Sequence, residues 1–342
     1  MRLIIDAMSG DFAPVEIVKG ALFAAKDLSG REDISLVLVG DEAKILACIK
    51  DEGAECPDNI SIVHTEEVLT MEDDPMSIMK EKRNSSMGVA LTLLKEGADA
   101  MISAGNTGAL HAGSSLIVRK MKGVRRSALA TILPLEKPLL LLDCGANPVV
   151  TSDILCQWAI LGSIYMESVM GVKNPGVGLL NNGAEEHKGT PVAVEAHHAL
   201  KNMPINFVGN VEGKEVPTGV CDVLVTDGFT GNILLKYSEG FGKFFLGKLK
   251  KLFKKNIFSM LAYGLVKKSL MEIRDQFNAS KYGGALFLGL AKPVIKSHGS
   301  SDAEAIRASV HQAVAFVEQN TIEKMADQIR GAFGAAEKSA DA

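Results

Sequence analysis

Short runs of aliphatic residues recur along this chain. Each run ends in a cluster of Gly, Asn, Asp, Ser or Thr, and an amphipathic helical pattern usually follows. Strands that are apolar throughout are typical of parallel sheets covered by helices on both faces. The sequence therefore predicts an α/β fold built on a doubly wound, mostly parallel sheet. The expected strands are residues 3–5, 35–39, 61–63, 100–102, 139–142, 177–180, 205–208, 223–225 and 294–295.

The order of these elements also predicts how many domains the chain forms. No linker rich in Pro, Ser or Gly divides the 342 residues. We therefore expect one Rossmann-like α/β domain over residues 1–330 and a flexible tail over residues 331–342.

Composition excludes several classes of protein. The net charge is only -4, so nothing global attracts nucleic acid, and aromatic residues at 5% are too few to form base-stacking platforms. The five cysteines are odd in number and contain no C-x-x-C pair, which is typical of reduced thiols in the cytosol. The first apolar run is too short for a signal peptide, and no run approaches the ~20 residues that span a bilayer. We expect a cytoplasmic protein, for which attachment to a membrane surface stays open.

The polar clusters after the strands share a chemistry that suits an anion. Glycine lets backbone amides approach a ligand closely, and helix N-termini present unpaired N–H groups with a partial positive charge. If such loops gather at one edge of a sheet, they form a phosphate-type site. The alternative is that Gly and Asn are merely common turn residues.

One of these clusters, residues 178–190, carries the densest set of chemical groups. An aliphatic run ends at Asn181, Asn182 and Gly183, and two acids, His187 and Lys188 follow. Thr190 then precedes a proline at the expected start of a helix. A lysine beside helix N-termini is suited to hold an anion or to stabilise a developing oxyanion. The alternative is a charge that faces solvent.

Common catalytic signatures are missing from the sequence. No G-x-S-x-G or H-E-x-x-H motif occurs. Residues 242–248 match a P-loop until Leu249 stands in place of its Ser or Thr, and no strand precedes them. Cys144 has no base beside it in the sequence, so a structural role is expected, and His197 and His198 lie inside a helix where metal ligation is a poor fit.

Residues 240–271 differ from the rest of the chain because no acidic residue lies between Glu239 and Glu272. We expect a protruding amphipathic helical segment here, suited to an anionic membrane surface or to an acidic protein partner. The alternative is a core or dimer helix with a solvated basic face. The expected apolar face contains Phe241, Phe244, Phe245, Leu249, Leu252 and Phe253, and the expected basic face contains Lys243, Lys250, Lys251, Lys254 and Lys255.

Eight motifs, which follow or flank the expected strands, stand out along the chain. They are DAMSGD (6–11), SAGNTGA (103–109), LDCGANP (142–148), LLNNGAEEHKGT (179–190), GNVEGKE (209–215), VTDGFTGN (225–232), YGGALFLGL (282–290) and SHGSSDAEA (297–305). Together these motifs make the chain resemble the bacterial PlsX family of phosphate acyltransferases over about residues 1–330.

The resemblance implies a function and a set of partners. Such enzymes transfer a long fatty acyl group from acyl carrier protein to inorganic phosphate, and the acyl-phosphate product feeds a glycerol-3-phosphate acyltransferase in phospholipid synthesis. They are similar in fold to phosphotransacetylases and to isocitrate- and isopropylmalate-type dehydrogenases. The family also implies a homodimer on the inner membrane face. Because phosphate is already an oxyanion, this chemistry requires no cofactor and no metal.

We accordingly expect Lys188 and Asn232 to be catalytic, with Asn182 and His187 in support. The residues expected to bind or shape the phosphate pocket are Asp6, Gly10, Asn106, Thr107, Asn147, Asn181, Asp227 and Gly231.

Three other functions compete with this one. A phosphotransacetylase acting on short acyl-CoA fits the loops, but it has no use for a basic, Phe-rich protrusion. A nicotinamide-dependent decarboxylating dehydrogenase needs substrate arginines, which the site loops almost lack. A non-catalytic membrane scaffold for enzymes of lipid synthesis predicts no phosphate-dependent consumption of acyl carrier protein thioester.

Overall fold

One mixed sheet of eleven strands runs through the protein. The computed structural model describes residues 1–277 and 279–340, with backbone only for 279 and 334–340. The strand order is β3-β2-β1-β4-β11-β10-β5-β6-β9-β7-β8. The strands are β1 (Arg2–Asp6), β2 (Ser35–Gly40), β3 (Ile60–His64), β4 (Ala100–Ser103), β5 (Ala128–Leu133), β6 (Leu139–Leu142), β7 (Gly176–Asn181), β8 (Asn206–Glu212), β9 (Val223–Val225), β10 (Ala285–Leu288) and β11 (Val294–Lys296).

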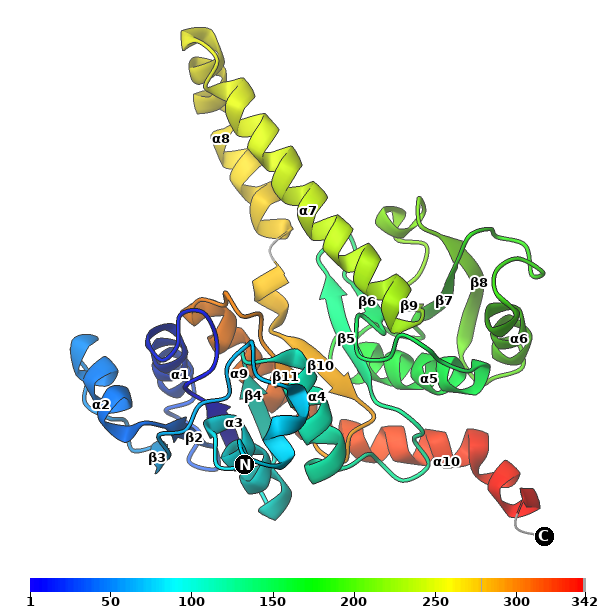
Figure 1. Ribbon diagram of the computed structural model, residues 1–342. Coiled ribbons are helices and arrows are strands. Elements are labelled where there is room, and N and C mark those ends of the chain that lie inside the picture. Colours follow the sequence, from blue (N-terminus) through cyan, green and yellow to red (C-terminus); the bar gives the residue numbers. More distant parts are fainter. Residues whose placement is uncertain (278, 341–342) are drawn as a thin grey trace.

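Two strands in the middle of the sheet divide it into two parallel groups. Strands β3, β2, β1, β4 and β11 are parallel and form the first strand group, and β6, β9, β7 and β8 form the second. Between the groups, β10 and β5 pair antiparallel to each other and to their outer neighbours. Figure 1 shows the first group with α1–α4 on one side and the second with α5 and α6 on the other.

The predicted mostly parallel α/β sheet is confirmed, but the sheet is mixed, and β5 and β10 were not among the expected strands. Both are apolar runs of at most six residues, with sequences ALATIL and ALFL. Such short runs carry no periodicity that separates a strand from a buried helical segment. These two strands introduce all of the antiparallel pairing between the named strands.

Helices cover both faces of the sheet. Alternate residues of β1 enter different cores, because Leu3 and Ile5 pack with α1 and α9 while Ile4 packs with α3 and α4. The helices are α1 (Val15–Asp27), α2 (Glu42–Asp51), α3 (Ser86–Glu96), α4 (Thr107–Gly113), α5 (Ser152–Ser168), α6 (Pro191–Leu200), α7 (Gly228–Phe253), α8 (Ile257–Gln276), α9 (Ala303–Glu318) and α10 (Thr321–Ala340), with short turns η1 (Pro75–Met79), η2 (Ser114–Val118), η3 (Val216–Thr218) and η4 (Ala279–Tyr282).

Several element boundaries differ from the sequence-based expectations. The strand expected at 205–208 continues to Glu212 as β8, because its pairing with β7 resumes after an irregularity beside Val177 and Gly178. The polar stretch after the strand expected at 223–225 ends at Asp227, which caps α7. The tail expected from 331 is helical as far as Ala340, and residues 341 and 342 lie outside the described residues.

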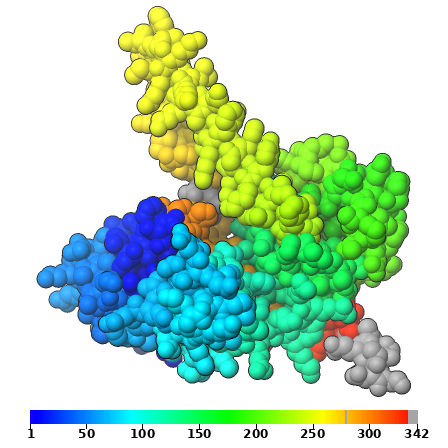
Figure 2. Space-filling view, viewed as in Figure 1, coloured from blue at the N-terminus to red at the C-terminus, as the bar shows by residue number. Residues whose placement is uncertain are grey.

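Helices α7 and α8 form an arm that stands away from the sheet (Figures 1 and 2). We use "arm" for residues 240–276, the outer part of α7 together with α8. Helix α8 has no buried residue. The buried residues of α7, Gly228 and Gly231, lie near its start and outside the arm. None of the helices in the described part of the chain combines the length and the apolar character needed to cross a bilayer.

Candidate active site

The loops that follow β6, β9 and β7 are neighbours in space. These three strands are adjacent and parallel, so their carboxyl ends lie at the same edge of the sheet. Such an edge is the usual ligand site of open α/β sheets. Most of the expected site residues lie in these loops or at the start of the helix that follows them. They are Asn147, Asn181, Asn182, His187, Lys188, Asp227, Gly231 and Asn232.

Asp143 organises the first of these loops. Its carboxylate is fully buried and accepts five hydrogen bonds. Oδ1 accepts from the backbone N–H groups of Leu129, Gly145 and Ala146 at 3.2, 3.0 and 3.0 Å. Oδ2 accepts from the backbone and side-chain amides of Asn147 at 2.6 and 2.8 Å. Since the Asn147 amide also donates to the carbonyl of Ser127 at 2.8 Å, it shapes the loop and has no N–H left for a ligand.

The first turn of α7 packs directly on the Asp143 loop. Asp227 caps the helix by accepting from the N–H and the hydroxyl of Thr230 at 2.9 and 2.8 Å. A Cβ added at Gly231 would lie 1.9 Å from the carbonyl oxygen of Asp143, so a side chain does not fit there. Asn232 follows on the exposed side, where a Cβ added at Gly145 would lie 3.7 Å from its Oδ1. Gly231 and Asn232 thus belong to the start of α7 and not to the polar loop before it.

The loop after β7 is held together by Asn181. Its Oδ1 accepts from the N–H of Asn182 at 2.8 Å, and its Nδ2 donates to the carbonyl of Lys188 at 3.0 Å. Gly189 follows with φ of +99°, and an added Cβ there would lie 2.4 Å from Asn181 Oδ1. Asn181 therefore maintains the turn through both ends of its amide, with one N–H of Nδ2 used in the bond to Lys188.

Lys188 is exposed on this loop. Its aliphatic stem lies against Gly183, where an added Cβ would lie 2.9 Å from Lys188 Cγ. Among the described residues, no carboxylate lies within ion-pair distance of its ammonium group. Asn182 and His187 are exposed beside it. These three polar side chains are available to a substrate, although no contact joins them to Asn232 in the described residues.

The loops of the first strand group form a second cluster. The backbone N–H of Asp11 donates to the carbonyl of Gly299 at 2.7 Å, and that of Ser297 donates to the carbonyl of Ser103 at 3.0 Å. Gly10 has φ of +119°, and an added Cβ would lie 3.0 Å from the Cβ of Ala104. A glycine is thus required where the loops after β1 and β4 meet.

Two of the residues expected to shape the phosphate pocket, Asp6 and Asn106, make hydrogen bonds within this cluster. Asp6 is fully buried and accepts from the hydroxyl of Ser103 at 2.7 Å. Burial raises the pKa of Asp6, an effect that nearby serine hydroxyls partly offset. Asn106 caps α4, accepting from the N–H of Ala109 at 3.1 Å and donating to the carbonyl of Met71 at 3.1 Å. Beside Asn106, Thr107 is the exposed first residue of α4.

Lys296, at the end of β11, is a residue of this region that the sequence analysis did not single out. The side chain is buried, with 8% exposed, and burial lowers its pKa to about 8, against the opposing effect of Asp11 and with a further lowering by Lys236. The sequence does show a lysine at the end of an otherwise aliphatic strand, which could have marked Lys296 as a candidate. It does not show that the side chain is buried.

Lys236, one turn after Asn232, connects the two clusters electrostatically. It contributes to lowering the pKa of Lys296 and of His298 in the first cluster, where burial is the main cause. In the second cluster, burial raises the pKa of Cys144 well above its usual value, and Lys236 partly offsets this. The charge of Lys236 therefore acts on groups in both loop clusters.

Other candidate sites do not coincide with these loops. A cavity of about 470 Å³ lies between α5, η4 and α9, lined by residues such as Tyr165, Met170 and Arg307. Within the described residues, no three side chains of His, Cys, Asp or Glu are grouped closely enough to ligate a metal ion. The loop clusters on either side of Lys236 remain the best candidate for an active site.

Solved structures with the same fold include phosphotransacetylases. The phosphotransacetylase of Streptococcus pyogenes matches with a TM-score of 0.60 and 16% identity, over 93% of this chain and 94% of that one. A branched-chain phosphotransacylase of Enterococcus faecalis V583 matches with a TM-score of 0.54 and 16% identity, over 93% and 99%. The protein is therefore an α/β protein with the phosphotransacetylase fold.

Sequence relatives define the family more narrowly. The family model described as "Fatty acid synthesis protein" matches residues 1–324. The phosphate acyltransferase of Oceanobacillus iheyensis is 46% identical over 93% of this chain and 94% of its own, and that of Fusobacterium nucleatum is 44% identical over 95% and 98%. The chain belongs to this family of fatty acid synthesis proteins, the PlsX phosphate acyltransferases, and the resemblance predicted from its motifs is confirmed.

Proposed function

We propose that the protein transfers a long-chain fatty acyl group from acyl carrier protein to inorganic phosphate. The family and its phosphate acyltransferase relatives support this activity. The structural observation that carries the proposal is that cationic and amide side chains border the loop clusters, while the thiol of Cys144 is buried with a raised pKa. Since a buried, protonated thiol is a poor nucleophile, phosphate itself attacks the thioester.

The reaction needs positioning more than side-chain chemistry. An oxygen of hydrogen phosphate attacks the thioester carbonyl, forming a C–O bond and a tetrahedral oxyanion. The oxyanion collapses, the C–S bond breaks, and the thiolate takes up the proton that phosphate loses. The products are acyl phosphate and the free thiol of the carrier protein. The enzyme accelerates this step by holding phosphate beside the carbonyl and by stabilising the oxyanion.

We assign the polar groups of the second cluster to catalysis. Lys188 stabilises the oxyanion or the incoming phosphate, and Asn232 donates a hydrogen bond from the first turn of α7. The exposed position of Lys188 and the uncommitted amide of Asn232 support these roles. Asn182 and His187, beside Lys188, assist it.

The remaining site residues shape the pocket around the substrate. Their contacts within their own loops support a positioning role, since most have no donor free for a ligand. Thr107 is the exception, because it is exposed at the start of α4. The pocket-shaping set is Asp6, Gly10, Asn106, Thr107, Asn147, Asn181, Asp227 and Gly231.

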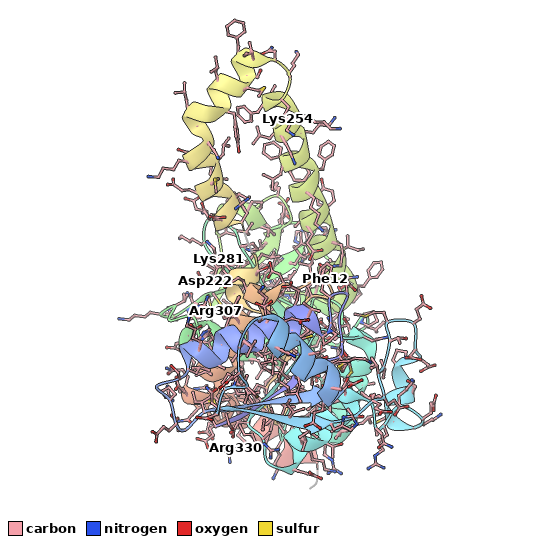
Figure 3. The ribbon with its side chains drawn as sticks, turned by 90° about the vertical axis from the view of Figure 1, so that its left-hand side faces the viewer. Phe12, Asp222, Lys254, Lys281, Arg307 and Arg330 are labelled. Atoms are coloured by element: carbon pink, nitrogen blue, oxygen red, sulfur yellow. The ribbon has the colours of Figure 1, made fainter. Side chains whose placement is uncertain are left out.

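The arm is proposed to receive the acyl carrier protein and to contact an anionic membrane surface. Carrier proteins of this kind are acidic, and the lysines of the arm are exposed, with Lys254 near its tip (Figure 3). Apolar side chains of the arm are also exposed, including Phe244 at 59%, Leu252 at 57% and Leu265 at 89%. A surface that combines such residues suits an anionic bilayer, where the long-chain product is released.

Two further partners follow from the family. A homodimer would cover part of the apolar surface that the arm leaves exposed, which supports pairing of arms from two copies. Acyl phosphate is a reactive mixed anhydride, so an enzyme that acylates glycerol 3-phosphate is the expected consumer downstream. We therefore propose a peripheral protein of the inner face of the membrane that hands its product to such an acyltransferase.

A single assay tests the proposed function. Purified protein is incubated with long-chain acyl-acyl carrier protein with and without inorganic phosphate, and thioester loss and acyl phosphate are measured. Phosphate-dependent formation of acyl phosphate is the expected result. Acetyl-CoA serves as the comparison donor, because a short-chain phosphotransacetylase would prefer it. Loss of neither thioester in the presence of phosphate would leave the protein as a non-catalytic scaffold.

A further inference from the structure

Lys296 is a buried cation that has no carboxylate partner among the described residues. It ends β11, between β4 and β10, and 8% of the residue is exposed. Its Nζ donates to the carbonyl oxygens of Ala104 at 3.2 Å and Ser297 at 2.5 Å. No acidic group in the described part of the chain lies within 4.0 Å of it. Buried lysines are rare unless they are paired or functional, so this ammonium group calls for an anion.

The surroundings of Lys296 are those of a binding site. The carbonyls that hold its ammonium group belong to the loops after β4 and β11, and the loop after β1 packs against both through Gly10 and Asp11. An ammonium group has three N–H donors, and two are used here. The third has no acceptor among the described residues. The lysine is thus held by backbone groups while one donor stays available.

The charges near Lys296 come from four elements. Asp6 on β1 and Asp11 in the loop after it favour the charged ammonium, while Lys236 on α7 disfavours it. His298, on the same loop as Lys296, is affected by both lysines. Burial is the largest influence and lowers the pKa of Lys296 to about 8, so the group is mostly charged at neutral pH.

We propose that Lys296 binds the inorganic phosphate that attacks the thioester, with its free N–H directed to a phosphate oxygen. The inference rests on the proposed function and adds a phosphate-binding residue to it. Lys296 belongs to the first strand group, whereas Lys188 belongs to the second. Lys236 forms an ion pair with Glu239 at 3.0 Å, which compensates the charge of Lys236 but not that of Lys296. A phosphate dianion bound to Lys296 would also offset the repulsion between the two lysines. Phosphate is then held from the first cluster while Asn232 and Lys188 act from the second.

Steady-state kinetics of Lys296→Met test this role. Methionine keeps most of the length of the side chain but removes the charge and all three donors. We expect the KM for phosphate to rise about tenfold or more, the effect of losing a charge-assisted hydrogen bond, while the KM for the acyl donor stays close to the original. Lys296→Arg keeps the charge and should recover part of the affinity. An unchanged phosphate KM in Lys296→Met overturns the inference.

Lys292→Met is the matched control. Lys292 lies just before β11 and its Nζ also donates to a backbone carbonyl, that of Ala98, but at the opposite end of the strand. This variant should keep the phosphate KM of the unsubstituted protein. An equal rise in both variants would assign the effect to general loss of a lysine contact and would overturn the inference.

Direct binding separates this inference from the proposed function. Equilibrium dialysis with radiolabelled inorganic phosphate requires no acyl donor. Binding that Lys296→Met abolishes supports the inference even if no donor is ever consumed, in which case the proposed function fails alone. Normal turnover with normal phosphate binding in Lys296→Met overturns the inference and leaves the proposed function intact.

The unsubstituted protein offers a measurement that does not depend on a variant folding. Because Lys296 loses its proton with a pKa of about 8, phosphate affinity should fall as the pH rises above that value. Inorganic phosphate itself stays a dianion there, so the fall reports on the protein. Lys296→Arg should show no such fall, since arginine stays charged. Phosphate affinity that is constant from neutral to alkaline pH overturns the inference.

Discussion

Gly231 and Asp143 are in such close contact that a Cβ on Gly231 would lie 1.9 Å from the Asp143 carbonyl oxygen. This contact joins the first turn of α7 to the loop after β6 and so fixes the position of Asn232. Gly240, nine residues further along the same helix, has no atom within 4 Å of an added Cβ. The two glycines therefore have opposite requirements within one helix.

Alanine substitutions at these glycines should change stability in opposite directions. Gly231→Ala forces α7 away from the Asp143 loop, and we expect a loss of about 1–3 kcal/mol in the free energy of unfolding together with a loss of turnover. Gly240→Ala should instead gain up to about 1 kcal/mol, because alanine favours the helix. Urea denaturation and acyl-phosphate formation measure both effects. Equal stability of the two variants would contradict the importance of the close contact.

Removing the amide of Asn232 should slow the reaction without unfolding the protein. An oxyanion donor is worth about 3–4 kcal/mol, so kcat of Asn232→Ala should fall about 100- to 1000-fold. Lys188→Ala should cause a similar loss. Asn206→Ala, an exposed residue at the start of β8, serves as the control and should keep full activity. Near-normal kcat in folded Lys188→Ala or Asn232→Ala would remove that residue from the catalytic set.

Replacing Cys144 distinguishes direct attack by phosphate from a thioester intermediate on the protein. Burial raises the pKa of this thiol well above its usual value, so we expect Cys144→Ala to keep most of its turnover. Cys221→Ala, at another buried cysteine, controls for the small cavity that each substitution leaves. A loss of activity confined to Cys144→Ala, with radiolabelled acyl groups trapped on the unsubstituted protein, would instead indicate covalent catalysis.

Acidic substitutions on the arm should prevent membrane binding. The double variant Leu249→Glu/Leu252→Glu loses two apolar contacts and adds charges that an anionic surface repels, so we expect vesicle affinity to fall about 100-fold or more. Turnover with saturating acyl carrier protein thioester should be retained. Leu46→Glu/Val220→Glu places the same charges at exposed apolar positions outside the arm and should bind vesicles normally. Vesicle co-sedimentation decides, and unchanged binding of the arm variant would refute the membrane role.

The pKa of Lys296 predicts a stability difference at alkaline pH. Its folded-state pKa is about 8 against an ordinary 10.5, so between these values the unfolded chain binds more protons than the folded one. The stability contributed by this group therefore rises as the pH increases from about 8 to 10.5, by about 3 kcal/mol in the free energy of unfolding. Lys296→Met lacks this rise. Urea denaturation at both pH values, with Lys292→Met as control, measures the difference.

Much of the fold was predictable because it depends on local patterns. Continuous aliphatic strands and the turn residues after them mark the parallel sheet, and Thr190 caps α6 as expected. The central strands β5 and β10 were not predictable, because their pairing is set by distant segments rather than by their own sequences.

The candidate site was predictable in its location more than in its details. The sequence shows that an asparagine follows a strand, but not what its amide contacts. Asn147 and Asn181 have their amides bonded within their own loops, whereas that of Asn232 stays free. Lys296 was missed since burial is a property of tertiary packing, and β1, the loop after β1 and α7 all contribute to the charges around it.

Because α7 is one uninterrupted helix from Gly228 to Phe253, the direction in which side chains at the tip of the arm point is fixed relative to that of Asn232. Each residue of an α-helix advances about 1.5 Å and turns about 100°, so Phe253 lies roughly 32 Å beyond Asn232. Inserting or deleting a single residue in α7 would rotate the Phe and Lys stripes by more than a quarter turn, whereas removing seven residues would keep them almost in phase. Natural length variation in this helix should therefore occur in steps of whole turns, matched by equal changes in α8.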